Sequence, residues 1–129
     1  MLAIDTNVVV RLLTGDHPEQ SARAKALIAE NDVLVTSTVL LETEWVLRSG
    51  FGFDRAQVVS ALTLFAGLPH VVMAEPDRVA AAIESLDQGM DFADALHLAG
   101  AAGCEAFVTF DKRLIKAATT QRLGIVREP

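Results

Sequence analysis

Cysteine is almost absent from this sequence, and Cys104 is the only one in 129 residues. An internal disulfide is therefore excluded, and Cys104 has no second thiol with which to build a zinc site. For such a residue, a small buried side chain is a far more common role than a reactive thiol. A single cysteine also fits a reducing compartment.

Long hydrophobic runs are absent too. The apolar stretches are short and interrupted by charged residues, so no segment is expected to span a bilayer. The opening residues Met-Leu-Ala-Ile-Asp lack the basic region of a signal peptide. Together these features predict a cytoplasmic protein with no membrane segment.

The sequence has no excess of basic residues. Eleven Lys and Arg face 17 Asp and Glu, which gives a net charge of −6. This balance argues against a protein that holds nucleic acid through a broad basic surface, because such affinity comes from neutralising phosphates. A nuclease is still allowed, because acidic residues gathered around a divalent cation have their local charge reversed.

Half of the sequence is apolar, which is enough to build a core. The length is that of a common single domain, and no repeat, linker or low-complexity tract divides the chain. We therefore expect residues 1–129 to form one domain that folds by itself.

The spacing of apolar residues predicts strands and helices in alternation. Strands are expected at 2–4, 33–35, 71–73 and 106–110, with an edge strand at 125–126. Helices are expected at 8–13, 18–30, 39–48, 55–65, 76–86, 92–102 and 112–118. The strands are too apolar to have a solvated face, so the pattern predicts an α/β fold with a parallel sheet covered by helices on both sides.

Two acidic residues directly follow predicted strands. Asp5 comes after Leu2-Ala3-Ile4, Asp111 comes after 107–110, and each then begins a helix. Ligands of open parallel sheets bind beyond the carboxyl ends of the strands, which makes both residues candidates for a site. The alternative is that both are helix N-caps, and for either residue alone this is the more common role.

A third candidate, Glu42, is expected within the helix at 39–48. Helical geometry places it beside Val39 and Val46, at the edge of the stripe predicted to face the core. A carboxylate that is partly desolvated there needs a partner, and a metal ion would supply one. Glu44 points the opposite way on the same helix and is expected to be a solvated surface residue.

The segment Asp91-Phe92-Ala93-Asp94 places two aspartates on one helix face beside the core. Asp94, well inside the helix, is the better metal candidate. The alternative is a capping arrangement in which Asp91 is the N-cap and Asp94 is favoured by the helix dipole.

Four carboxylates without a Cys or His cluster favour a hard cation, so Mg²⁺ or Mn²⁺ is expected rather than zinc. His97 is near but solitary, and a surface or packing role is more common for such a residue. The chemistry that this set of ligands supports is hydrolysis, because a bound cation activates water and offsets charge on a phosphate.

Four segments together resemble the PIN-domain family, and within it the VapC-type toxin ribonucleases. They are Ile4-Asp5-Thr6-Asn7, Leu41-Glu42, Asp91 to Ala99, and Thr109 to Leu114. Their order and their spread over the whole chain make the resemblance specific. It implies a three-layer α/β/α PIN-like fold, with a central, mostly parallel sheet flanked by helices.

The resemblance also implies roles for individual residues in endonucleolytic cleavage of RNA. Asp5, Glu42, Asp94 and Asp111 would be the catalytic residues that bind Mg²⁺ or Mn²⁺. Supporting roles would fall to Thr6, Asn7, Asp91 and Thr109, where Asp91 could bind metal, orient a ligand or only cap the helix. Candidate contacts to RNA phosphates, each with a solvated helix residue as the alternative, are Arg11, Lys112, Arg113 and Lys116.

The resemblance implies two protein partners: a small cognate antitoxin and a second copy of the chain in a homodimer. Trp45 and Leu41 form a second apolar stripe on their helix, which suits burial against another chain. Burial against a neighbouring helix of the same domain is an equally good interpretation.

Two other functions share some of these features. A phosphoacceptor signalling domain is also a small α/β protein with magnesium-binding acids, but it needs paired acids after the first strand, where Asp5 stands alone. It also needs an acceptor Asp after a central strand, and no strand before Asp111 supplies one. A non-catalytic binding module is the second alternative, and the presence of all four acids argues against it.

Overall fold

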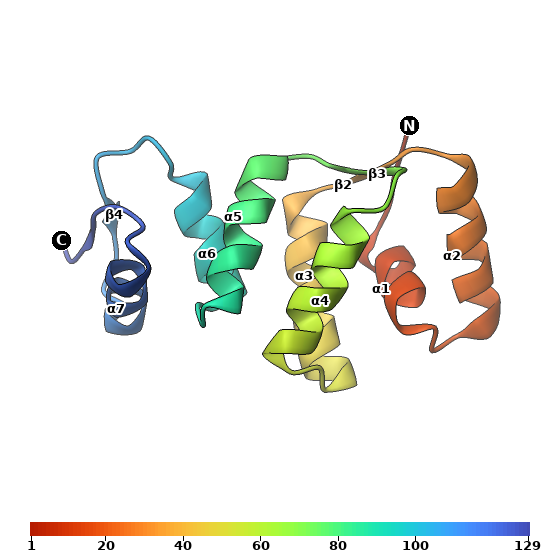
Figure 1. The fold of residues 1–129 in the computed structure, drawn as a ribbon, viewed down its shortest axis with the longest axis horizontal. Coiled ribbons are helices and arrows are strands. Elements are labelled where there is room, and N and C mark those ends of the chain that lie inside the picture. Colours follow the sequence, from red (N-terminus) through yellow and green to blue (C-terminus); the bar gives the residue numbers. More distant parts are fainter. The chain divides into compact units, whose positions relative to one another are not determined.

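The computed structural model describes residues 1–129 as seven helices and five short strands, in the order predicted from the sequence (Figure 1). The strands are β1 (Leu2–Ala3), β2 (Val33–Val35), β3 (Val71–Met73), β4 (Phe107–Val108) and β5 (Val126–Arg127). The helices are α1 (Thr6–Thr14), α2 (Pro18–Glu30), α3 (Ser37–Phe51), α4 (Arg55–Ala66), α5 (Pro76–Asp87), α6 (Phe92–Gly100) and α7 (Lys112–Gln121).

The chain forms two compact units, residues Met1–Pro76 and Asp77–Pro129. The first contains a three-stranded sheet in the order β1-β2-β3, and the second contains the two-stranded sheet β4-β5. Every strand pair is parallel. The predicted α/β class with parallel strands and packed helices is therefore confirmed.

In the first unit, the core lies around β2 and the helix α3 that follows it. Val33 and Val35 have no exposed surface, because β2 lies between β1 and β3. Ile4 extends the pairing beyond β1, since its N–H donates to the carbonyl of Leu34. Helix α1 packs on α2 and α3, and α4 packs on α3 and β3. The sheet thus fixes where α1 and α3 begin.

In the second unit, the core lies between α5 and α6. Phe92 and Ala82 have no exposed surface, and Met90 is also buried. The guanidinium of Arg78 donates from Nε to the carbonyl of Leu96 at 2.9 Å, which joins the first turn of α5 to the middle of α6. Helix α7 packs on β5.

The rotation of α3 about its axis differs from the prediction. The buried side is formed by Leu40, Thr43, Glu44 and Leu47, whereas Glu42 is exposed. The predictions of a partly desolvated Glu42 and a solvated Glu44 are therefore wrong. Val39 and Leu40 are neighbours of equal hydrophobicity, so the apolar pattern left the phase of this helix ambiguous by about one residue.

Burying Glu44 is tolerated because Arg48, one turn later, pairs with it. Arg48 donates from Nε to both carboxylate oxygens, at 3.2 and 3.3 Å. The Glu44 side chain is only 4% exposed, whereas that of Arg48 is 52% exposed. A buried carboxylate thus keeps a partner whose charge still meets solvent.

The strands are less covered than their apolar sequences predict. Leu2, Val72 and Val108 are 43%, 39% and 48% exposed. The strands are two or three residues long, and β1 and β4 each have a single neighbouring strand. Short edge strands leave some side chains in contact with water, so the expectation of fully buried strand faces was wrong here. No helix of the structure combines the length and hydrophobicity needed to cross a membrane.

Candidate functional site

Asp5 lies where β1 leads into α1, and its carboxylate is not used by the helix. It occupies the N-cap position, and its carbonyl accepts from the N–H groups of Val8 and Val9. Its side chain makes no capping hydrogen bond and is exposed. The N-cap interpretation therefore explains the backbone of Asp5 but not its carboxylate, which is free to bind a ligand.

The next two residues behave differently from each other. Thr6 is 4% exposed, and its Oγ1 is buried without a hydrogen-bond partner. A buried hydroxyl normally finds a partner, because leaving it unpaired costs about 1 to 3 kcal/mol. Thr6 does not hydrogen-bond to Asp5 here. Asn7 is exposed and lines a groove between α1 and α2.

Glu42 lies on α3 next to the buried Thr43 and is itself exposed. It forms no ion pair, in contrast to Glu44, which is paired with Arg48. The two glutamates of this helix therefore have separate roles. Glu44 is part of the packing, and Glu42 presents an unpaired carboxylate to solvent.

Asp91 is the N-cap of α6, as one of the two sequence interpretations proposed. Its Oδ2 accepts from the N–H of Asp94 at 3.1 Å. Asp94 follows in the first turn and is half-buried. Capping accounts for one oxygen of Asp91 and leaves the carboxylate of Asp94 without a hydrogen-bond donor.

Asp111 is held tightly at the start of α7, directly after the β4 region. Its Oδ1 accepts from the N–H groups of Arg113 and Leu114, at 2.9 and 3.2 Å. Its own N–H donates to Thr109 Oγ1 at 3.0 Å. Thr109 thus orients the turn that carries Asp111, and Oδ2 of Asp111 has no partner in the chain.

The pKa of Asp94 is raised above its ordinary value of 3.8. Partial burial is the largest cause, followed by the negative charges of Asp91 and Asp111, and His97 opposes the shift. Asp94 is therefore near enough to Asp91 and to Asp111 to be repelled by both. This part of the second unit has a local excess of negative charge.

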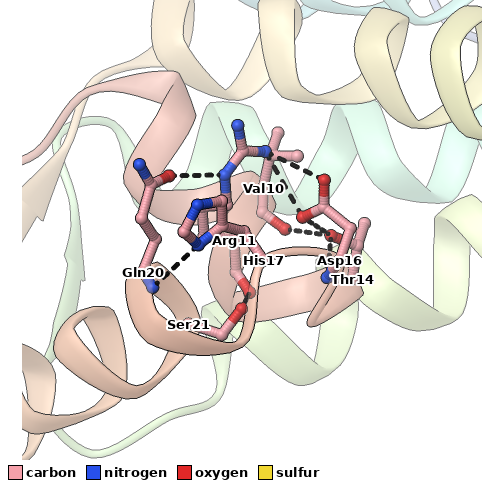
Figure 2. A network of polar contacts seen from close by, with 7 residues as sticks. All are labelled: Val10, Arg11, Thr14, Asp16, His17, Gln20 and Ser21. Carbon is pink, nitrogen blue, oxygen red and sulfur yellow. Dashed lines mark hydrogen bonds and ion pairs between the residues drawn. The ribbon is translucent and has the colours of Figure 1, made fainter.

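Of the four basic residues proposed to contact RNA, Arg11 is already engaged. Its Nε donates to Gln20 Oε1 at 2.7 Å, and its Nη1 pairs with Asp16 Oδ2 at 3.2 Å (Figure 2). The other three, on α7, are exposed and form no ion pair. They are Lys112, Arg113 and Lys116. Helix α7 therefore offers free cations next to Asp111.

The structure brings together only part of the predicted set. Asp94, Asp91 and Asp111 interact within the second unit, while Asp5 and Glu42 belong to the first. No group of three or more His, Cys, Asp or Glu side chains forms a metal-binding arrangement. Each unit thus contributes two of the four predicted ligands.

The sequence matches the PIN domain family over residues 2–119, across both units. PIN domains are a superfamily of nucleases, and this protein belongs to the PIN domain family. Membership supports a nuclease function and argues against a phosphoacceptor signalling domain. No curated protein and no solved structure matches the chain.

PIN domains usually bind divalent metals, and the oxygen ligands that the four predicted acids offer are of the type that such ions prefer. The four acids offer only carboxylate oxygens, and none of them is paired with Lys or Arg. Asp94, whose pKa is raised by burial and by Asp91 and Asp111, has no Lys or Arg beside it, and a divalent cation would supply positive charge there. The unpartnered Oγ1 of Thr6 adds a polar atom beside Asp5 that a bound water could satisfy.

Two features of the first unit are not among the residues that the sequence predicts for a site. Arg23 lines a groove between α1 and α2. The spacing of Gln20, Arg23, Ala24 and Leu27 marks one face of α2, which was a usable signal. The partners of Arg11 were missed as well, because Asp16 and Gln20 reach it only after the turn between the helices is formed.

Proposed function

We propose that this PIN-domain protein is a cytoplasmic endoribonuclease that depends on Mg²⁺ or Mn²⁺ and hydrolyses RNA phosphodiester bonds. Asp5, Glu42, Asp94 and Asp111 are the proposed metal ligands and catalytic residues. The assignment of these four together rests on the sequence motifs and on family membership.

The observation that carries the proposal is the state of Asp94. Asp94 is partly buried, is repelled by two neighbouring acids and has no Lys or Arg partner, and His97 opposes the pKa shift without reversing it. The neighbouring charges raise the free energy of the ionised Asp94 carboxylate, and no contact within the chain offsets this cost. A divalent cation bound by these carboxylates would offset the repulsion and favour the ionised form of Asp94.

The chain's own residues have distinct tasks in the proposed reaction. Thr109 holds the turn that presents Asp111, and Asp91 caps the helix that presents Asp94. Lys112, Arg113 and Lys116 bind phosphates on either side of the one that is cut. When bound, a divalent cation supplies acidity to the attacking water and offsets charge on the phosphate.

We further propose that the protein is the toxin of a toxin–antitoxin pair, bound by a small antitoxin and able to form a homodimer. The VapC-like motifs support the toxin role. Trp45 supports a protein partner, because it is 58% exposed and no neighbouring helix covers it. Leu41, one turn earlier, is half-buried on the same stripe.

The test is cleavage of mixed structured RNAs by protein freed of any co-purified partner, in Mg²⁺ or Mn²⁺. Asp94→Asn and EDTA should each reduce cleavage by at least 100-fold, in line with the loss of a charge-stabilising group. Asp87→Asn is the matched control, because it makes the same change at an exposed residue of the same unit. Cleavage that survives Asp94→Asn, or none by the unaltered protein with either metal, would refute the proposal and favour a non-catalytic binding module.

A further inference from the structure

A groove of about 340 Å³ lies between α1 and α2, entirely within the first unit. The two helices lie side by side (Figure 1). The lining residues are Asn7, Val8, Arg11, Gln20, Arg23, Ala24 and Leu27. This volume lies at the small end of the range of ligand pockets, about 300 to 1,000 Å³, and is enough for one planar group.

The floor of the groove is apolar and its rim is polar. Val8 contributes from α1, and Ala24 and Leu27 contribute from α2. Ala24 keeps the floor open, since a larger side chain at this buried position would fill it. The polar rim consists of two amides and two guanidiniums, from Asn7, Gln20, Arg11 and Arg23.

The two arginines of the rim are in different states. Arg11 is fixed between Gln20 and Asp16, so its charge is compensated by the Asp16 carboxylate (Figure 2). Arg23 is exposed and makes no hydrogen bond or ion pair. The groove therefore has a rigid guanidinium on one side and a free cation on the other.

Two residues of the groove's rim follow the proposed catalytic residue Asp5 on the same helix. Asn7 is two residues along α1 from Asp5, and Arg11 is six residues along, which corresponds to about 9 Å of helix. Both residues therefore lie within two turns of Asp5 along α1.

We propose that this groove binds one nucleotide of the single-stranded RNA substrate. The base lies on Val8 and Leu27, the amides of Asn7 and Gln20 read its edge, and Arg23 contacts its phosphate. This inference rests on the proposed ribonuclease function. A nucleotide uses the apolar floor, the amides and the free cation together, whereas an apolar peptide would leave Arg23 without a partner.

The test measures binding without cleavage, so that it is independent of the catalytic proposal. A fluorescein-labelled single-stranded RNA of ten nucleotides is titrated with the full chain in EDTA, and anisotropy is recorded. Arg23→Gln should weaken binding about fivefold or more. Lys25→Gln, the same charge change two residues along α2 and outside the groove, should have less than half of that effect.

Two further readouts separate a phosphate contact from a general loss of charge. Arg23→Gln should make the slope of log affinity against log salt shallower by about 0.7, as expected for one lost single-strand phosphate contact. In ¹⁵N NMR spectra, the RNA should shift the side-chain amide signals of Asn7 and Gln20 but not that of Asn31.

Equal RNA affinity of the Arg23→Gln and Lys25→Gln proteins would overturn the proposal. The groove would then be better interpreted as a binding site for a protein. RNA that fails to bind the unaltered chain would also overturn it. Cleavage that depends on Asp94 but not on groove residues would refute this inference alone. Binding through the groove without any cleavage would refute the ribonuclease function alone. Circular dichroism of both variants confirms that each is folded.

Discussion

At the scale of single residues, three aspartates at helix N-termini look alike in the sequence and differ in the structure. Asp91 and Asp111 accept hydrogen bonds from backbone N–H groups of the following turn, whereas Asp5 does not. The residue type allows capping, but only the local backbone decides whether the carboxylate turns toward the helix. Asp5 therefore keeps its full capacity for an external ligand.

The raised pKa of Asp94 predicts the effect of its charge on stability. A carboxyl whose pKa is higher in the folded than in the unfolded state costs stability when ionised, and this cost disappears as the pH falls below the unfolded value of about 4. In EDTA, Asp94→Asn should therefore raise the melting temperature at pH 7, and the gain should shrink toward pH 4. Melting followed by circular dichroism at several pH values tests this, and a variant less stable than the original at pH 7 would contradict it.

At the scale of secondary-structure elements, the side chain of Arg78 connects α5 to α6. Its guanidinium lies against Gly100, at the end of α6. A Cβ added at Gly100 would lie 2.8 Å from Cζ of Arg78, whose Nε donates to the carbonyl of Leu96. Gly100 thus leaves room for the guanidinium that binds the Leu96 carbonyl in the middle of α6. In contrast, a Cβ at Gly50, near the end of α3, would meet only Val46 Cγ1 at 3.8 Å.

These two glycines predict opposite outcomes for the same substitution. Gly50→Ala should stabilise the protein by about 0.5 to 1 kcal/mol, because alanine favours helix. Gly100→Ala should give no gain or a loss of about 1 kcal/mol, because it displaces the Arg78 guanidinium. Urea unfolding measures both. In an Arg78→Ala background, Gly100→Ala should become stabilising. If it does not, contact with the Arg78 guanidinium is not the reason that alanine is unfavourable at position 100.

At the scale of the whole molecule, a net charge of −6 makes metal binding and general screening easy to confuse. Any salt reduces repulsion among the acids. Specific binding of a metal ion to the folded protein adds a stabilisation that grows with the metal concentration. It reaches about 2.7 kcal/mol when the free metal is at 100 times its dissociation constant. Mg²⁺ or Mn²⁺ should therefore raise the melting temperature of the unaltered chain more than NaCl of equal ionic strength does.

The same measurement on variants assigns the effect to the proposed site. Asp94→Asn should remove most of the additional rise, and Asp87→Asn should retain it. A rise of equal size in all three proteins would indicate screening only, and the proposed metal ligands would then have to be revised.

Most element boundaries could be predicted from the sequence. Strands 33–35 and 71–73 and the helix from Pro18 to Glu30 agree with the structure. These elements are bounded by residues with strong local preferences, such as Pro18 at the start of α2. The strand predicted at 106–110 is shorter in the structure, because only Phe107 and Val108 pair with β5. The acidic motifs that indicate the PIN family were also visible, since they are short local patterns.

The sequence by itself determined the order of strands and helices, the α/β class and the family, because these depend on local periodicity and on short motifs. The tertiary structure decided which side of α3 is buried, whether Asp5 caps its helix, and that Arg11 is held by Asp16 while Arg23 stays free. Each of these depends on which residue packs against which, at distances along the chain that no local pattern encodes. When the apolar residues of a helix could face the core in two ways, packing against neighbouring elements decides which side is buried. That packing forms only in the folded protein.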